Sequence, residues 1–235
     1  MTEDFELRTS PDSFLALRCA GCGSVFLSLV PAEEALGRIF PPGYRASPTP
    51  PWPPSPAGSR VLDLGPWVAS EQLRPLALDG EYDLVRIDLT LECAAHPVEL
   101  LRTVRAALRP GGRALTLLNN LTSPTFALFG GRHWGGYDTP RQQRVLSRDG
   151  LARLAAAASM ELEAVTALPA GELWLRSIHR WCSDWGAPGW LARRFSDHAR
   201  VSRVLFRLVD QLFRRSGRSA LTLATLRRPN PGEAP

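Results

Sequence analysis

The sequence has no lysine, few cysteines and no long apolar run. All 28 basic residues are arginine, and with 23 acidic residues they give a formal net charge of +5. Four cysteines in 235 residues are too few for a disulfide framework. No segment reaches the roughly 18 uninterrupted apolar residues of a membrane-spanning helix, and the acidic start lacks the pattern of a secretory signal. We therefore expect a cytoplasmic protein.

The positive charge is concentrated toward the C-terminus. Residues 1–175 hold 16 Arg against 19 Asp and Glu, a net charge of −3, whereas residues 176–228 hold 12 against 3, a net charge of +9. Any electrostatic argument about a partner therefore concerns the second segment. The absence of lysine clusters and of any known nucleic-acid module argues against nucleic acid as that partner.

Composition divides the chain into an extension, a linker and a larger domain. Residues 1–40 form an N-terminal extension that contains Cys19 and Cys22. Residues 41–57 are predicted to be a polyproline-like linker, because half of their first 16 positions are proline, which fixes φ and lacks an amide donor. Residues 58–235 alternate between strand and helix patterns, as in an α/β domain.

The α/β pattern can be followed along this larger domain. Strands are predicted at 59–65, 81–91, 113–120, 162–168 and 219–229. Helices are predicted at 97–108, which stops at Arg-Pro-Gly-Gly, and at 149–158. Strand, helix and strand in this order form a βαβ unit, which implies parallel pairing.

A helical insertion rich in Trp and Arg, residues 173–216, interrupts this pattern. Its periodicity predicts one long amphipathic helix, or two with a bend. The apolar face is predicted to hold Leu191, Phe195, His198, Val201, Leu205, Leu208 and Leu212. The opposite face is predicted to hold Arg193, Asp197, Arg200, Arg207 and Arg214. Asp210 and Arg214 have the spacing of a favourable ion pair.

Several segments resemble the class I S-adenosylmethionine (SAM)-dependent methyltransferases. The resemblance rests on RVLDLG, EYDLVRIDLTLE, HPVELLRTVRAALRPGGRALTLLNN and FGGRHWGGYDTPRQQRVLSRDGLARLA. The Trp-Gly…Pro-Arg part and the Cys-x-x-Cys-Gly segment resemble a bacterial subgroup that often acts on glycans, lipids or secondary metabolites. The resemblance implies a Rossmann-like sheet, SAM as cofactor and a small-molecule or glycan acceptor.

Two features depart from that family. Asp63 and Gly65 match the loop after the first strand, but Pro66 and Trp67 replace residues that would let backbone amides approach the cofactor. Only the 16 residues 66–81 precede the next matching strand, whereas one βαβ unit needs roughly 30. We therefore expect a sheet reduced by two strands and a degraded SAM site.

The resemblance assigns residues to two sides of the pocket. The cofactor side would comprise Asp63, Gly65, Glu92 and Asn119, and the acceptor side His133, Tyr137, Pro140 and Arg141. In a catalytic interpretation, His133 or Tyr137 is a base and Arg141 binds an anion. In a structural interpretation, the segment is a lid loop packed by Trp134. Gln142 replaces the usual histidine of the family and cannot act as a base.

Cys19 and Cys22 have the spacing of a zinc knuckle. A structural zinc ion needs four ligands, and residues 1–18 contain no Cys or His. We therefore expect no metal site, and two thiols in a turn.

The sequence leaves two functions open. One is methyl transfer from SAM to a small-molecule or glycan acceptor. The other is a catalytically inactive methyltransferase-like protein that acts as a partner subunit or reuses the pocket for SAM-independent chemistry. For the insertion, the alternatives are a lid, a contact in a homo- or heterodimer, and peripheral contact of residues 190–215 with an anionic membrane.

Overall fold

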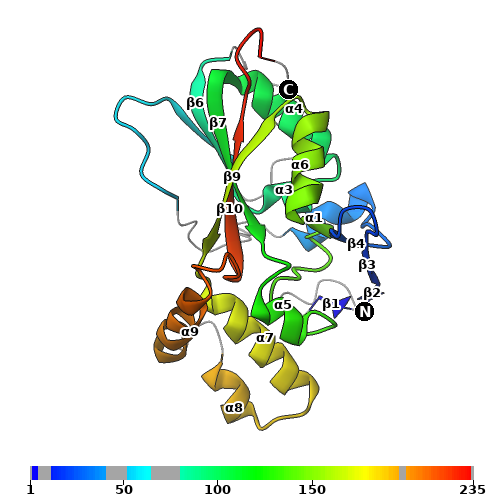
Figure 1. Cartoon of the computed structure of the whole chain (residues 1–235). Helices are drawn as coiled ribbons and strands as arrows, with labels where there is room; N and C mark the ends of the chain where they lie inside the picture. The colour runs from blue at the N-terminus through cyan, green and yellow to red at the C-terminus, as the bar shows by residue number, and fades with distance from the viewer. Residues whose placement is uncertain (1, 5–11, 41–51, 65–79, 196–199, 234–235) are drawn as a thin grey trace.

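The main element of the structure is a five-stranded mixed sheet. The computed structural model describes residues 2–4, 12–40, 52–64, 80–195 and 200–233. Its main sheet has the order β5-β6-β7-β10-β9 (Figure 1). The strands are β5 (Val61–Leu64), β6 (Tyr82–Ile87), β7 (Leu108–Asn119), β10 (Leu221–Arg227) and β9 (Glu161–Leu168). The first three are parallel, and β10 runs antiparallel between β7 and β9.

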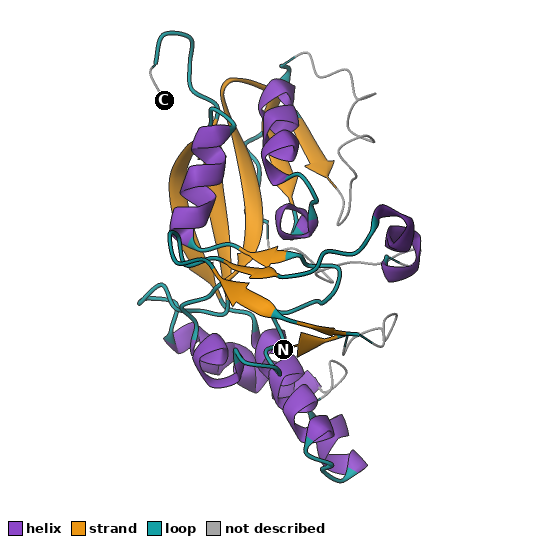
Figure 2. Ribbon diagram, turned by 90° about the vertical axis from the view of Figure 1, so that its right-hand side faces the viewer, coloured by secondary structure: helices purple, strands orange, loops and turns teal. Residues whose placement is uncertain are grey.

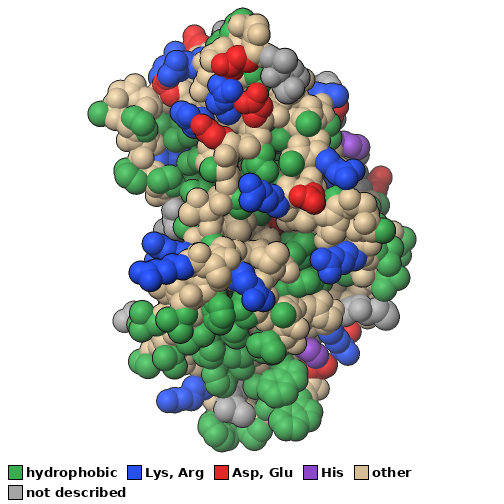
Figure 3. Space-filling model, viewed as in Figure 1, with side chains coloured by type: hydrophobic (Ala, Val, Ile, Leu, Met, Phe, Trp, Pro, Cys, Tyr) green, Lys and Arg blue, Asp and Glu red, His purple; other side chains and the backbone are tan. Residues whose placement is uncertain are grey.

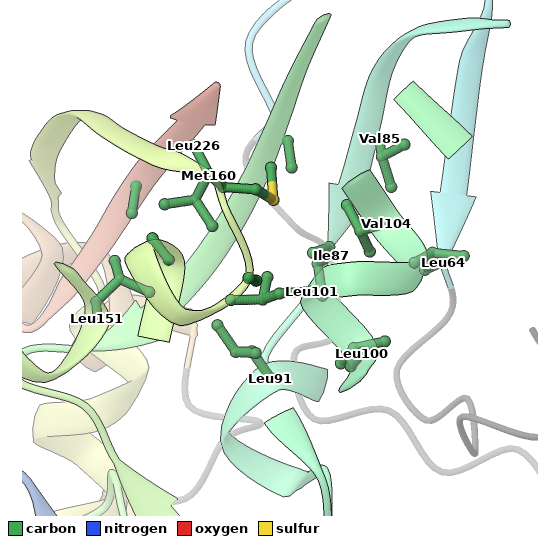
Figure 4. Packing of buried hydrophobic residues seen from close by; sticks show 14 of the residues in the cluster. Leu64, Val85, Ile87, Leu91, Leu100, Leu101, Val104, Leu151, Met160 and Leu226 are labelled. Atoms are coloured by element: carbon green, nitrogen blue, oxygen red, sulfur yellow. The ribbon is translucent and has the colours of Figure 1, made fainter. Parts of the chain in front are cut away.

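Two helices pack their apolar sides on this sheet. They are α4 (Pro97–Ala107) and α6 (Arg148–Ala157). Their buried leucines, with Val85 and Ile87 of β6 and Leu226 of β10, form the main core, as Figure 4 shows. The helical periodicity read from residues 97–108 and 149–158 is therefore confirmed, because it marks the residues that these helices bury.

Helix α4 ends before the Arg-Pro-Gly-Gly segment, as the sequence predicted, and the segment itself belongs to the next strand. It lies inside β7, where the register against β6 shifts between Tyr82 and Leu84. Gly111 has a φ of +74°, a conformation that favours glycine. A Cβ on Gly112 would lie 2.8 Å from the Arg109 carbonyl oxygen and 3.1 Å from that of Tyr82. The glycines thus permit an irregular start to the strand.

The N-terminal extension pairs with the larger domain. Strands β3 (Ala16–Arg18) and β4 (Val25–Leu27) join β8 (Arg144–Val145) in a three-stranded antiparallel sheet. Strands β1 (Thr2–Glu3) and β2 (Ser13–Phe14) form a short hairpin-like pair, followed by η1 (Glu33–Ala35) and α1 (Leu36–Ile39). Residues 41–51 of the expected linker lie outside the described residues, and 52–57 form no helix or strand.

The helical insertion comprises α7 (Gly171–Asp184), α8 (Gly189–Arg194) and α9 (Arg200–Leu212). Figures 1 and 2 show these helices gathered at one end of the sheet. Close packing of α7 on α9 requires glycine at 171, where a Cβ would lie 2.5 Å from the Arg207 amide nitrogen. Helices α8 and α9 are two separate elements, and Asp197 and His198 between them lie outside the described residues.

Two short helices complete the described fold. Helix α3 (Thr90–Cys93) directly follows β6, and α5 (Pro124–Phe129) follows β7. The Ser123 hydroxyl caps α5 by accepting a hydrogen bond from the Phe126 amide, which satisfies one of the free donors of a helix N-terminus. These elements place the segment 130–146 beside the carboxyl ends of β6 and β7.

Candidate functional site

The candidate site lies at the carboxyl ends of the parallel strands, where open α/β sheets bind ligands. Asp63, near the end of β5, is exposed, and its Oδ1 lies 3.5 Å from Arg86 Nη1. Gly65, Pro66 and Trp67 lie outside the described residues. Within the described part of the chain, β5 is the edge strand on this side of the sheet. Whether the sheet is reduced by two strands stays a prediction, because residues 65–79 after β5 lie outside the described residues.

Glu92 is the centre of a buried hydrogen-bond network. Its Oε1 accepts from the Leu146 amide at 2.9 Å. Its Oε2 accepts from Gln142 Nε2 at 2.5 Å and from the amide and Nδ2 of Asn119 at 3.3 and 3.4 Å. Glu92 is fully buried. Both oxygens therefore serve to join α3, β7 and the segment before α6.

Burial also changes the charge of Glu92. Removal from water raises the pKa of its carboxyl to about 8, although the amide donors of Leu146, Asn119 and Gln142 act in the opposite direction. Burial penalises the charged form of an acid. Glu92 is thus mainly neutral at pH 7, and its hydrogen bonds connect α3 to Asn119, Gln142 and Leu146.

Asn119 connects this network to a small cavity. Its Nδ2 also donates to the Gly136 carbonyl at 3.0 Å, while its buried Oδ1 has no hydrogen-bond partner among the described residues. The strand-end cavity is lined by Leu89, Asn119, Gly135, Gly136, Asp138, Gln142, Ala170, Glu172, Leu173, Arg176 and Leu221. Its volume is about 30 Å³, which is enough for one or two water molecules.

The strand-end cavity, as the described residues bound it, is smaller than a pocket for a ligand such as SAM. Pockets for ligands of such size measure roughly 300 Å³ or more, and the strand-end cavity has about a tenth of that volume. Of the expected cofactor-side residues that are described, Glu92 accepts hydrogen bonds from internal donors with both oxygens, and Asp63 lies beside Arg86 at the sheet edge. Among these described residues, Asn119 is the one that lines the cavity.

Arg141, expected on the acceptor side, is wholly buried among internal acceptors. Its guanidinium donates to Asp4 Oδ1 at 2.7 Å, to Asp138 Oδ1 at 2.8 Å and to the Ile39 carbonyl at 3.2 Å. Asp4 is also buried. The Arg141 guanidinium therefore links Asp4 and Ile39 of the N-terminal extension to Asp138, and these contacts are all internal to the protein.

Tyr137 also has an internal partner. Its hydroxyl donates to the Gly130 carbonyl at 3.0 Å, and its ring packs edge-on against buried Trp134 with 5.0 Å between centroids. Burial raises the pKa of Tyr137 to about 12. A phenol with that pKa stays protonated near neutral pH, which favours the structural interpretation of this segment.

His133 differs from these two because it retains contact with solvent. Its Nε2 lies 2.8 Å from Asp184 Oδ2, and the pKa of Asp184 is lowered, chiefly by this hydrogen bond. His133, Tyr137 and Arg141 are all absent from the lining of the strand-end cavity. The structure thus separates the expected acceptor-side residues from the cavity at the strand ends.

Sequence reasoning missed Arg180, a buried residue of α7. Its Nη1 donates to the carbonyls of Trp134 and Tyr137 at 2.6 and 2.9 Å. A signal was present, since Arg180 follows the buried Leu173 and Ser177 at helical spacing. A charged residue on the buried face of a helix indicates an internal partner. Asp4, by contrast, gave no such signal.

Cys19 and Cys22 form a turn beside a larger hollow. The turn is closed by hydrogen bonds from the Cys19 amide to the Ser24 carbonyl and from the Gly23 amide to the Cys19 carbonyl, both 2.8 Å. A mainly apolar pocket of about 390 Å³ includes both thiols in its lining. A hydrogen bond to Ser24 lowers the pKa of Cys22. Among the described residues no three His, Cys, Asp or Glu side chains are grouped to hold a metal ion.

The strand order defines the class of fold. Parallel β5, β6 and β7, with antiparallel β10 between β7 and β9, form the α/β, class I methyltransferase-like sheet that the sequence predicted. No family model matches the chain, and no curated protein matches it.

Solved structures share part of this fold at low identity. The [4+2]-cyclase SpnF is 15% identical over 63% of this chain, with a TM-score of 0.35. A SAM-dependent methyltransferase from Thermotoga maritima is 14% identical over 66%, with a TM-score of 0.40. Geranyl diphosphate C-methyltransferase from Streptomyces coelicolor is 15% identical over 63%, with a TM-score of 0.34. The chain spans 50%, 61% and 46% of these three proteins.

Proposed function

We propose that this chain is a methyltransferase-like protein that does not transfer methyl groups from SAM and has a SAM-independent binding role. The observation that carries this proposal is that both carboxyl oxygens of Glu92 accept hydrogen bonds from within the protein. If the site held a cofactor as the resemblance implies, the carboxylate that follows β6 would face that ligand. Here its two oxygens meet donors from Leu146, Asn119 and Gln142.

The size of the strand-end cavity supports the same proposal. About 30 Å³ admits water but not a nucleoside. Opening it would require moving Gly135 and Gly136. A Cβ on Gly135 would lie 2.7 Å from the Leu173 carbonyl, which shows how closely this segment packs on α7.

The acceptor side gives independent support. Methyl transfer depends on holding an acceptor in line with the methyl donor. Arg141 binds Asp4 and Asp138, and Tyr137 binds the Gly130 carbonyl. Neither group is left to orient an acceptor.

One observation favours the second candidate, SAM-dependent methyl transfer to a small-molecule or glycan acceptor. The buried Asn119 Oδ1 has no partner among the described residues and borders a cavity that Glu172 and Arg176 also line. An unsatisfied polar atom at the carboxyl end of a strand is a feature of ligand sites in α/β sheets.

Calorimetric titration separates the two candidates. We expect no heat of binding and no thermal shift with SAM or S-adenosylhomocysteine at millimolar concentration. Saturable binding of either compound would refute the proposal and support the second candidate. In that case Asp63→Ala should weaken binding, whereas Glu163→Ala should not. Glu163 is a matched control because it also pairs with an arginine on the sheet, at 2.6 Å from Arg113.

A further inference from the structure

Helix α9 presents its most apolar side to solvent. Five of its aliphatic side chains are between 56% and 83% exposed: Val201, Val204, Leu205, Leu208 and Leu212. Their spacing places them within about 100° of the helix circumference. Four of the five, Val201, Leu205, Leu208 and Leu212, belong to the apolar face that the sequence predicted, and the stripe points away from the rest of the described protein.

The orientation of α9 is fixed by its other side. Asp210 is buried and accepts hydrogen bonds from the Ala170 amide at 2.9 Å, from Trp174 Nε1 at 3.0 Å and from the Ala220 amide at 2.9 Å. Phe206 stacks on Trp174 with 5.9 Å between centroids. The expected Asp210–Arg214 pair is replaced by these contacts. Since Asp210 and Phe206 hold one side against α7, the apolar stripe cannot turn inward.

Tryptophans extend the apolar surface onto the neighbouring helices. Trp181 and Trp185, at the end of α7, stack with 5.6 Å between centroids, and both are exposed. Trp190 of α8 is 64% exposed. Helix α7 packs against both α8 and α9. Figure 3 shows hydrophobic side chains gathered over this part of the molecule, with arginines around them.

Positive charge accompanies this surface. Arg203 and Arg207 of α9 are exposed, but helical spacing places both nearer to Asp210 than to the centre of the apolar stripe. Arg214, Arg215 and Arg218 lie exposed just beyond the helix. Together with the rest of residues 176–228, they give the segment its net charge of +9.

We propose that the surface of α7–α9 binds the anionic face of a lipid bilayer, with the stripe of α9 and Trp181, Trp185 and Trp190 in the interface. Apolar residues on one side of a helix, exposed arginines just beyond its C-terminal end and exposed tryptophans match the physical requirements of such binding. No helix among the described residues is long and apolar enough to cross a bilayer. The contact is therefore peripheral.

Charge selects the bilayer over a second copy of this chain. A two-fold symmetric contact places the same patch of both copies face to face. The exposed Arg214 and Arg215 of both copies would then belong to the facing patches and repel each other, whereas anionic headgroups attract arginines near the surface. The inference does not depend on whether SAM binds, because none of these residues lines the strand-end cavity.

Co-sedimentation with vesicles tests the proposal. The full chain is mixed with vesicles of phosphatidylcholine alone or with 30% phosphatidylglycerol, and pelleted protein is measured. We expect binding to the anionic vesicles only, with a blue shift of tryptophan emission. Leu205→Ala with Leu208→Ala should weaken binding at least tenfold. Leu29→Ala with Val30→Ala removes exposed side chains elsewhere and should leave binding unchanged.

A second pair of variants tests the electrostatic part. Arg214→Gln with Arg215→Gln should weaken binding to anionic vesicles roughly 30-fold, and 1 M salt should weaken it further because screening then acts over about 3 Å. Equal binding to both kinds of vesicle, or to neither, would overturn the proposal. So would a concentration-dependent dimer that Leu205→Ala with Leu208→Ala dissociates, since a second copy would then cover the stripe.

Discussion

The segment from 133 to 146 and the helical insertion distribute polar and apolar side chains in opposite ways. In the first, Arg141 and Gln142 are buried beside Glu92. In the second, Leu208 and Leu212 are exposed. Isolated buried charges cost several kcal/mol unless paired, and exposed leucines forgo about 25 cal/mol per Å² of burial. Folded proteins mostly bury apolar side chains and expose polar ones. The first region buries polar side chains, and the second exposes apolar ones.

The difference between the regions concerns what each side chain contacts. The buried polar groups of the first region are matched by internal partners, such as Asp4 for Arg141. The apolar stripe of α9 lies against none of the described elements, although Asp210 holds the helix firmly. The first region therefore maintains the fold, and the second offers a surface to a partner. The predictions below test this contrast.

The largest effect is expected from Arg141→Ala. Removing the guanidinium breaks the buried ion pair between Arg141 and Asp4, and loss of one member of a buried ion pair costs about 3–5 kcal/mol. Urea unfolding followed by circular dichroism measures this change. Arg132→Ala is the control, because Arg132 forms exposed pairs with Glu3 and Asp184 that contribute at most about 1 kcal/mol. Equal losses for both variants would contradict the structural role of Arg141.

Asp210→Ala comes next, and it tests the anchor of α9. The variant leaves Ala170, Trp174 and Ala220 donors without their acceptor, and each unsatisfied buried group costs roughly 1–3 kcal/mol, not additively. We expect a total loss of about 3 kcal/mol in the free energy of unfolding. Asp184→Ala should cost under about 1 kcal/mol, because Asp184 pairs at the surface. A similarly small loss for Asp210→Ala would mean that α9 is not held as described.

The sequence predicted the sheet better than the site. Period-two apolar alternation in residues 82–89 and helical spacing in 97–108 report local burial, so β6 and α4 could be found. The partners of Glu92 could not, because Gln142 and Leu146 lie at least 50 positions away. No local pattern encodes such a contact.

The insertion shows a second limit of sequence reasoning. The apolar stripe from Val201 to Leu212 could be seen in the sequence, but an amphipathic pattern does not tell whether its apolar side is buried. That depends on Asp210 and Phe206, which fasten the opposite side to Trp174. The same tertiary contact explains why the local Asp210–Arg214 pair does not form.

The pH dependence of stability tests the buried state of Glu92. The pKa of Glu92 is about 8 in the folded protein and near 4.5 in the unfolded chain. Between these pH values folding takes up a proton, so the free energy of unfolding falls as the pH rises from 4.5 to 8. The slope is about 1.4 kcal/mol per pH unit. Thermal unfolding from pH 5 to 8 measures it, and Glu92→Gln should flatten the profile. Glu163→Gln, at an exposed ion pair, should leave the slope intact; if it flattens the slope equally, Glu92 is not the source.

The smallest effect is expected where the apolar side chains are exposed. Leu205→Ala with Leu208→Ala removes no buried contact, and alanine suits a helix, so the free energy of unfolding should change by no more than about 0.5 kcal/mol. The fully buried Leu101 is the matched contrast, because Leu101→Ala should cost about 2–5 kcal/mol. Urea unfolding of the three proteins compares them. A large loss for the double variant would place the stripe of α9 against another part of the chain and remove it as a surface for a partner.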